Sequence, residues 1–270
     1  MSRIAIKNLW KQYGTNIVLE NLNLTIEDQE FVSIVGASGC GKTTFLRLLL
    51  GEERPSRGVI EIDDVALQPE PSVDRGVVFQ RYSVFPHLTV LKNVLLALEL
   101  REAKLLCRTF GNTRKKHIAR CKELLQRVGL GSALDQYPSA LSGGMQQRLA
   151  LCQALIAAPK ILLLDEPFGA LDPGIRKDMQ ALVAELHSEL QLTVIMITHD
   201  LSEGFELGTR LLVFDKTRND PHEPELFGAG ITYDLPLTTP LPDSLTLDVA
   251  LETDDQTANF DAMRSFAEAH

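Results

Sequence analysis

Residues 36–43 read Gly-Ala-Ser-Gly-Cys-Gly-Lys-Thr, a glycine followed by four residues and then Gly-Lys-Thr. Glycines in such a loop let backbone N–H groups point at phosphate oxygens, and a helix that begins there adds its positive N-terminal end. In this interpretation Lys42 reaches the β- and γ-phosphates of a nucleoside triphosphate, while the Thr43 hydroxyl binds Mg²⁺. The residues of this expected phosphate loop are Gly36, Ala37, Ser38, Gly39, Cys40, Gly41, Lys42, Thr43 and Thr44.

Cys40 lies inside this loop. A thiol near a helix N-terminus has a lowered pKa, which makes its thiolate more available. We therefore expect a thiol alkylator to inactivate the protein and bound nucleotide to protect it. The alternative is that Cys40 is an inert packing residue.

A pair of acids, Asp165 and Glu166, directly follows the apolar run at 161–164. In an open α/β sheet, ligands gather at the carboxyl ends of the strands. Asp165 is thus expected to hold Mg²⁺, directly or through water, and Glu166 to polarise the water that attacks the γ-phosphorus. The alternative is a solvated turn after a core strand.

Residues 141–148 read Leu-Ser-Gly-Gly-Met-Gln-Gln-Arg. A Ser-Gly-Gly turn that opens a helix offers a second phosphate-binding surface. One nucleotide does not need two such cradles. The sequence therefore predicts that the protein works as a pair, in which each copy closes the other's site.

The segments that must position these residues alternate between strands and helices, which predicts an α/β fold. Apolar residues alternate in 3–9 and 17–26, which indicates an antiparallel sheet at the edge of the domain. Further strands are expected at 31–35, 59–62, 76–79, 161–164, 193–197 and 211–214, and helices at 42–50 and 173–190.

From residue 81 to about 159 the pattern is helical, with helices expected at 88–100, 115–128 and 145–157. This block is interpreted as a helical subdomain inserted into an α/β domain of residues 1–215. After it, prolines interrupt any regular pattern. Residues 216–270 are therefore expected to be an irregular, acidic extension with at most one terminal helix.

The charge is concentrated in that extension. From Thr217 onward there are eleven acidic and two basic residues, which gives −9 and accounts for the whole net charge. Without a basic excess, nucleic acid is not expected as a partner. Scattered cysteines, no signal-peptide pattern and no apolar run near the ~20 residues of a membrane helix indicate a cytosolic protein. Any membrane association is then expected to come through a partner.

Taken together, these motifs resemble the ATP-binding subunits of ABC transporters over roughly residues 3–215. The resemblance implies a P-loop NTPase core with an antiparallel β edge subdomain and an inserted α-helical subdomain. It places Tyr13 where the family stacks an aromatic ring on adenine. Gln80 corresponds to the glutamine that senses Mg²⁺ and links to the membrane partner, and His199 to the histidine that contacts the γ-phosphate.

The same resemblance gives the Ser-Gly-Gly turn its role. Ser142, Gly143 and Gly144 match the signature that binds the partner copy's γ-phosphate, and Asp172 matches an aspartate that contacts the opposite monomer. The implied ligands are ATP and Mg²⁺, and the implied enzyme is an ATPase. The implied catalytic residues are Lys42, Gln80, Glu166 and His199, and the implied Mg²⁺ site comprises Thr43, Gln80 and Asp165.

The family also implies partners. The chain is expected to pair with itself or a paralogue, and to bind permease subunits at the cytoplasmic face of the membrane, with a solute-binding protein acting indirectly. Phe85 and Pro86 are candidate permease contacts. The motifs look most like importers of nitrate, sulfonate, taurine or bicarbonate. Residues 101–116 and 216–270 depart from that group and leave permease docking and regulation open.

Other functions remain open at this stage. A soluble ATPase acting on ribosomes or DNA usually has two cassettes, coiled-coil arms or basic patches, none of which this sequence has. A regulator that does not hydrolyse ATP would not need Lys42, Asp165, Glu166 and His199 together. An exporter subunit would carry the same ATP motifs as an importer.

Overall fold

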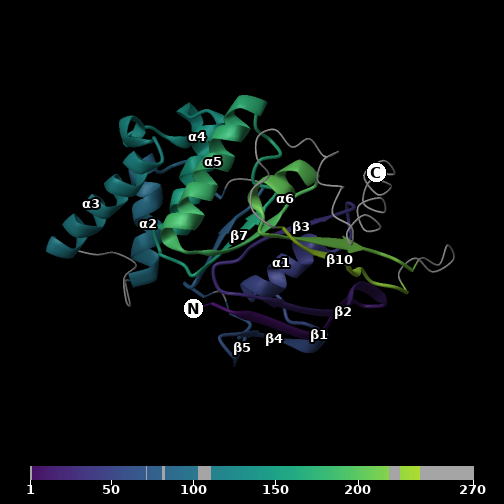
Figure 1. Cartoon of the computed structure of the whole chain (residues 1–270). Helices are drawn as coiled ribbons and strands as arrows, with labels where there is room; N and C mark the ends of the chain where they lie inside the picture. The colour runs from purple at the N-terminus through teal and green to yellow at the C-terminus, as the bar shows by residue number, and fades with distance from the viewer. Residues whose placement is uncertain (1, 71, 81–82, 103–110, 219–225, 238–270) are drawn as a thin grey trace.

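Two β-sheets enclose one helix in the computed structural model, which describes residues 2–70, 72–80, 83–102, 111–218 and 226–237 (Figure 1). The first sheet is antiparallel, with strand order β2-β1-β4-β5. Its strands are β1 (Ile4–Tyr13), β2 (Asn16–Ile26), β4 (Arg57–Ile62) and β5 (Val65–Ala66). The expected antiparallel edge sheet is confirmed.

The second sheet forms the core, with strand order β10-β9-β3-β8-β7-β6. Its strands are β3 (Phe31–Gly36), β6 (Arg75–Val78), β7 (Ile161–Asp165), β8 (Thr193–Ile197), β9 (Arg210–Asp215) and β10 (Gly230–Pro236). All pairs are parallel except β9 with β10. The buried faces of β7 and β8 explain their unbroken apolar runs, since both sides of a parallel sheet are covered.

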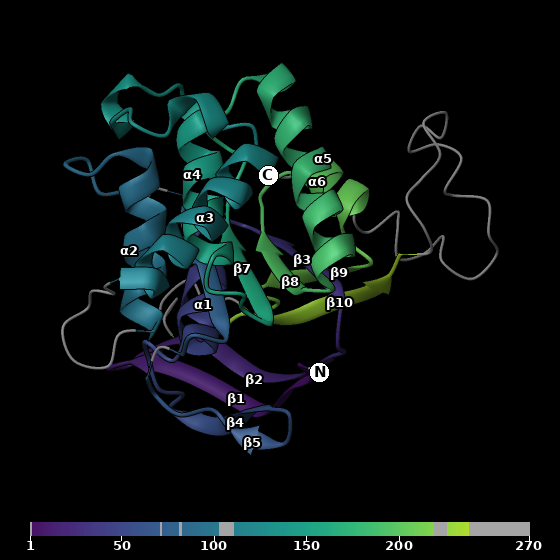
Figure 2. The ribbon, with the colours of Figure 1, turned by 90° about the vertical axis from the view of Figure 1, so that its left-hand side faces the viewer.

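Helix α1 (Lys42–Leu50) lies between the two sheets (Figure 2). Its apolar side chains, such as Phe45 and Leu49, share one buried cluster with Ile4 of the first sheet and Ile34 of the second. The helix ends at Gly51, whose positive φ would be strained for another residue. This packing fixes the N-terminus of α1 against the end of β3.

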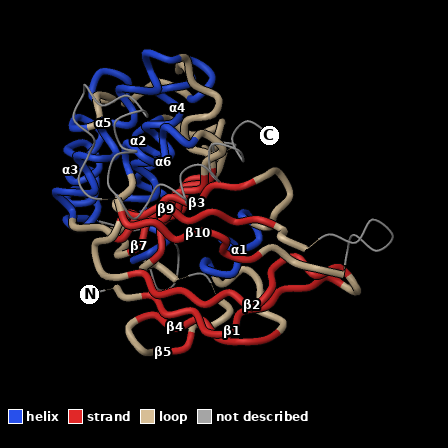
Figure 3. Tube along the Cα trace, turned by 45° about the vertical axis from the view of Figure 1, so that its right-hand side comes forward, coloured by secondary structure: helices blue, strands red, loops and turns tan. Residues whose placement is uncertain are grey.

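The remaining helices lie on the opposite side of the core sheet, away from the antiparallel sheet (Figure 3). Helices α4 (Gly143–Leu155) and α5 (Pro173–Leu190) pack on the core sheet, and α2 (Val90–Glu102) and α3 (Gly111–Arg127) pack on α4. The short helix α6 (Leu201–Leu207) packs beside β3 and β9. Two single 3₁₀ turns, Gly131–Ala133 and Pro138–Ala140, precede α4. The expected inserted helical subdomain is confirmed.

One expectation about the C-terminal extension is wrong. Residues 230–236 are not irregular but form β10, which pairs with β9 along the edge of the core sheet. Arg210 Nε and Nη2 each lie 2.6 Å from a carboxylate oxygen of Asp234, and Arg210 Nη1 donates to the carbonyl of Thr25 at 2.8 Å. Ile231, Tyr233 and Leu235 alternate along this strand and pack on the core clusters, but the prolines around the segment obscured this short pattern in the sequence. The expected terminal helix lies outside the described residues.

The structure describes part of the segment 101–116. α3 begins at Gly111, four residues before the expected start, so that residues 111–116 are helical. Residues 103–110 lie outside the described residues. Among the described helices, none is both long enough and apolar enough to cross a bilayer.

Candidate functional site

The loop between β3 and α1 is shaped by glycines that no other residue could replace without strain. A Cβ on Gly36 would lie 2.2 Å from the carbonyl oxygen of Phe214 in β9. Gly41 is the N-cap of α1 with φ 88°, and a Cβ there would lie 2.7 Å from Leu19. Because Gly41 has no side chain to accept from the first-turn amides, these donors suit an external anion.

Lys42 lies inside the loop and is only 7% exposed. Its Nζ donates to the carbonyl oxygens of Gly36, at 2.6 Å, and Ala37, at 2.9 Å. Ser38, Gly39 and Thr43 are exposed around it. The ammonium group is therefore held at the mouth of the loop, where phosphate oxygens could take over from the carbonyl acceptors.

The expected lowering of the Cys40 pKa is wrong. Burial raises the pKa of the Cys40 thiol, and the nearby Lys42 ammonium opposes this effect only in part. The side chain is 4% exposed and packs in the cluster between the sheets. A buried thiol in apolar surroundings is inert, so burial overrides the influence of the helix N-terminus.

The two acids lie at the carboxyl end of β7, and their environments differ. Asp165 is 8% exposed, and its pKa is raised by burial and then by the negative charge of Glu166. A hydrogen bond from the Thr43 hydroxyl opposes this shift. Glu166 has φ 46° and donates its N–H to Ile197 in β8 at 2.9 Å. This left-handed backbone is uncommon for glutamate, and such strain gathers at functional sites.

Two side chains from the ends of neighbouring strands lie close to one carboxylate oxygen of Glu166. Gln80, which follows β6, donates its Nε2–H to Glu166 Oε2 at 2.7 Å. His199, which follows β8, places Nδ1 3.7 Å from the same oxygen. Gln80 and His199 are exposed, whereas Glu166 is half-buried. Three loops thus meet at a polar centre beside the phosphate loop.

Tyr13 stands at the end of β1 with 45% of its surface exposed. Its hydroxyl donates to the Glu53 carboxylate, and Lys11 Nζ lies 4.7 Å from the ring centroid. Burial and the hydrogen bond to Glu53 raise the pKa of Tyr13, whereas a hydrogen bond with Thr44 lowers it. The bond to Thr44 connects this ring with the phosphate loop. Sequence reasoning missed Glu53 and Lys11, which belong to no motif.

The Ser-Gly-Gly turn lies elsewhere. Ser142 caps α4 by accepting from the N–H of Met145 at 3.4 Å, and both Ser142 and Gly143 are exposed. Asp172 is the exposed N-cap of α5 and makes no side-chain capping bond. Within the described ranges, no hydrogen bond or ion pair connects residues 142–144 with residues 36–44. One chain therefore does not join its two expected phosphate-binding surfaces.

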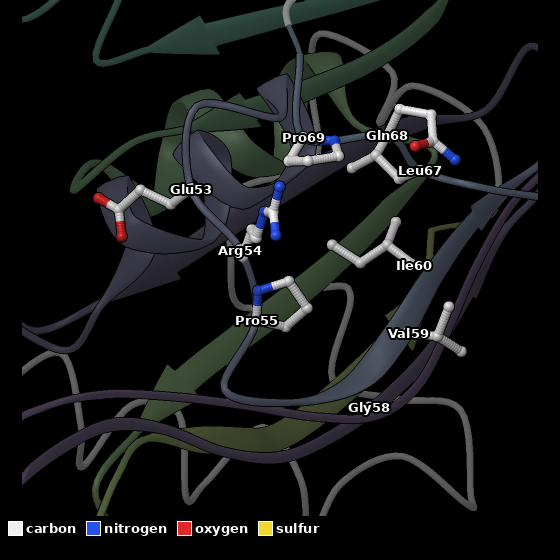
Figure 4. Close-up of a pocket in the computed structure, with 9 residues that line it drawn as sticks. All are labelled: Glu53, Arg54, Pro55, Gly58, Val59, Ile60, Leu67, Gln68 and Pro69. Carbon is white, nitrogen blue, oxygen red and sulfur yellow. The ribbon is translucent and has the colours of Figure 1, made fainter.

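A separate pocket of about 390 Å³ opens on the antiparallel sheet (Figure 4). Three segments line it: the turn after α1, strand β4, and the segment after β5. The lining residues are Glu53, Arg54, Pro55, Gly58, Val59, Ile60, Leu67, Gln68 and Pro69. The Glu53 carboxylate points away from the other lining side chains (Figure 4). None of the expected site residues lines this pocket.

The donor set suits a magnesium ion bound together with a nucleotide. The described residues contain no group of three His, Cys, Asp or Glu side chains that could hold a metal alone. Thr43 and Asp165 supply adjacent oxygen atoms, a hydroxyl and a carboxylate, joined by a hydrogen bond. Mg²⁺ commonly uses one or two protein oxygens and takes its other ligands from phosphates and water.

A phosphate loop between a core strand and a helix, with acids at the end of a neighbouring parallel strand, defines a P-loop nucleotide-binding protein. The chain belongs to the ABC transporter family, whose model matches residues 19–169, more than half of its 270 residues.

Several named relatives are similar to this chain. It is 40% identical over 235 residues to the sulfate/thiosulfate import ATP-binding protein CysA of Rhodopseudomonas palustris, covering 86% of this chain and 65% of the relative. It is 40% identical over 215 residues to the Fe(3+) ions import ATP-binding protein FbpC of Escherichia coli O157:H7, covering 79% and 59%. The chain thus spans less than two thirds of these relatives' length.

Solved structures share the fold. The dimeric, post-hydrolysis ATP-binding cassette MJ0796, bound to ADP and Pi, matches with a TM-score of 0.70 and 29% identity, covering 87% of this chain and 99% of that one. A second dimeric MJ0796 structure, titled a bacterial ABC transporter cassette, has a TM-score of 0.71 and 30% identity. These matches confirm the expected ABC ATPase fold.

Proposed function

We propose that the chain is the ATP-hydrolysing subunit of an ABC importer. The observation that carries this proposal is the convergence of Gln80 and His199 on one oxygen of Glu166, beside Lys42 in the phosphate loop. A carboxylate oriented in this way suits a general base that positions water for in-line attack on a γ-phosphate. Membership of the family and the names of the relatives support the same activity.

The residues of the phosphate loop would bind the triphosphate through backbone amides and Lys42, and the exposed Tyr13 ring would stack on the adenine. Thr43 and Asp165, with Gln80 nearby, would hold Mg²⁺, which supplies positive charge to the phosphates when bound. Glu166 would accept a proton from the attacking water. His199 would donate a hydrogen bond to the γ-phosphate from the adjoining loop.

Two copies would be needed to finish each site. Ser142 and Gly143 are exposed, Gly144 is buried beside them, and the turn is not joined to its own phosphate loop, so we propose that residues 142–144 close the loop of a second copy. Asp172 would contact the opposite monomer. The two similar MJ0796 structures are both dimeric, which supports this arrangement. Closure in the presence of ATP could drive work only if ATP favours the closed pair over the open one.

Permease subunits are the proposed membrane partners, with a solute-binding protein acting indirectly, at the cytoplasmic face. Phe85 and Pro86 are exposed before α2 and are candidate contacts. The 1–215 domain would supply ATP hydrolysis, and 216–270 would add β10 and the acidic remainder.

The proposed solute is a small inorganic anion. The sequence resemblance favoured nitrate, sulfonate, taurine or bicarbonate import, but the relatives compared above are named for sulfate/thiosulfate and Fe(3+) import. Six relatives that are 39% to 42% identical to this chain carry the sulfate/thiosulfate name, which favours an oxyanion of that kind. Selection of the solute would then lie with the permease and the solute-binding protein.

The decisive experiment uses the full chain and Glu166→Gln. Phosphate release should require Mg²⁺ and should fall by about 100-fold or more in the variant, while ATP binding persists. Light scattering should show an ATP-dependent dimer of Glu166→Gln. Mixing subunits that carry Lys42→Ala with others that carry Ser142→Arg should restore a single competent site. Normal turnover by Glu166→Gln, or full activity of the protein as a monomer, would contradict the proposal.

A further inference from the structure

The first turn of α5 contacts two loops that serve different purposes. Ile175 packs against the Ser-Gly-Gly turn, because a Cβ on Gly144 would lie only 2.4 Å from Ile175 Cγ2. The next residue, Arg176, turns toward the loop that follows β8. One rigid helical turn therefore connects the signature with the loop that carries His199.

The Arg176 side chain contacts both the loop before α5 and the loop that carries His199. Its Nη2 donates to the carbonyl of Leu171, just before Asp172, at 3.4 Å. Its Nη1 lies 3.5 Å from Asp200 Oδ2, and its Nε lies 3.9 Å from Glu203 Oε1. A single guanidinium thus bridges the loop before α5 and the start of α6.

Hydrogen bonds among Thr198, Asp200 and Glu203 fix the two residues on either side of His199. The Thr198 hydroxyl donates to Glu203 Oε2 at 2.5 Å and accepts from the N–H of Asp200 at 3.1 Å. Thr198 is 1% exposed and Glu203 is 4% exposed, so this anchor is buried. His199 itself is exposed and lies between two anchored neighbours.

The contacts of Arg176 are long for charged groups. Charge-assisted N–H···O bonds are usually about 2.7–2.9 Å, whereas its carboxylate contacts are 3.5 Å and 3.9 Å. Its buried Nε has no hydrogen-bond partner in this structure. A buried donor without an acceptor is costly, so a small movement of α5 toward the loop of His199 would strengthen the bridge.

We propose that Arg176 is a positioning residue that links the signature turn to His199 within one chain. Engagement of residues 142–144 by the nucleotide of a partner copy then shifts α5 and places His199 in the chain's own site. This inference rests on the proposed function, since it requires a nucleotide-bound dimer. It gives the two sites of the pair a route of communication through each subunit.

A mixed dimer tests this link in one direction. One subunit carries Lys42→Ala, so that its own loop binds no ATP, and is labelled with ¹³C-histidine. The unlabelled partner carries Glu166→Gln and holds the single ATP against the labelled subunit's signature. The His199 ring signal, assigned with His199→Gln, should shift when ATP is added.

The same measurement is repeated with Arg176→Gln in the labelled subunit, with Arg176→Lys as the conservative variant. The matched control is Lys177→Gln, which removes one positive charge from the exposed face of the same turn. We expect the ATP-dependent shift to be lost with Arg176→Gln, partly restored with Arg176→Lys, and retained in the control.

Light scattering separates the two hypotheses. If no ATP-dependent dimer forms, the proposed function fails, whatever the His199 signal does. If the mixed dimer forms but the His199 signal does not move, or moves equally with Arg176→Gln, the inference about Arg176 is overturned. Should Arg176→Gln fail to fold, an undiminished shift in Arg176→Lys and in Asp200→Asn would overturn it equally.

Discussion

Gln80 and Glu166 are neighbours because β6 and β7 are paired in parallel, with Val78 opposite Leu164. Each of the two polar residues follows its strand partner by two positions, so that the Gln80 amide reaches Glu166 Oε2 at 2.7 Å. The sheet register therefore sets the direction of the proposed general base. A residue 86 positions away in the chain holds it.

Removing this amide should impair turnover more than binding. A hydrogen bond to a charged group contributes about 1.5–3 kcal/mol, which corresponds to a loss of roughly 10–100-fold in turnover for Gln80→Ala. ATP affinity, measured by equilibrium titration, should change much less. Gln68→Ala, on the separate pocket, is the control. Equal turnover of Gln80→Ala and the unaltered protein would show that Glu166 needs no such orientation.

Asp165 should lower stability at neutral pH, because burial and the charge of Glu166 raise its pKa. Below the ordinary aspartate pKa the group is protonated whether the chain is folded or not, so it has no effect. As the pH rises through the raised native pKa, the folded state must accept a buried charge and loses stability.

Asp165→Asn should therefore be more stable than the unaltered chain at pH 7.5, and this gain should shrink towards pH 4. Urea unfolding in EDTA, without nucleotide, measures both values. Asp172→Asn, at an exposed aspartate, serves as the comparison. A less stable Asp165→Asn at neutral pH would contradict the burial argument.

Cys40 should react slowly with iodoacetamide in the native protein at neutral pH, because its pKa is raised by burial. Its reaction should accelerate only at a pH above the ordinary cysteine range, where the thiolate forms. Peptide mapping by mass spectrometry follows the modification, and the chain in urea provides the reference rate. Rapid labelling at neutral pH that ATP prevents would restore the expectation drawn from the sequence.

Asp234→Ala should destabilise the chain by about 1 kcal/mol. Its two-point contact with Arg210 has good geometry, but both side chains are partly open to solvent, which reduces the effect. Glu27→Ala, which breaks the more exposed pair with Arg3, should change stability by less than about 0.5 kcal/mol. Denaturant unfolding of the two variants gives the comparison, and equal effects would remove the special role of the Arg210 contact.

Much of the fold was predictable because local patterns and tertiary structure agree. Helix α5 and strand β8 have the expected bounds, Pro173–Leu190 and Thr193–Ile197, since a proline start and a short apolar run are strong local signals. The phosphate loop was predictable because its spacing specifies a backbone shape. The roles of the individual site residues remain predictions.

The features that could not be predicted depend on contacts between segments that are distant in the sequence. β10 was missed because prolines around it obscured the alternation of Ile231, Tyr233 and Leu235, and because its pairing with β9 cannot be seen in the sequence. The Cys40 environment was misjudged because the helix terminus is a local feature, whereas burial between two sheets is not. Arg176 and Glu53 belong to no motif, so only the folded chain reveals what they touch.

β10 also determines where this polypeptide can be shortened safely. A fragment stopping at Asp215 would retain every proposed nucleotide-binding residue, yet it would remove β10, the outer pairing partner of β9. The uncovered main-chain amides and carbonyls of β9 would then be available to strands of other molecules. Precipitation of such a fragment would report an open sheet margin rather than a damaged catalytic centre, so expression trials should extend beyond Leu237.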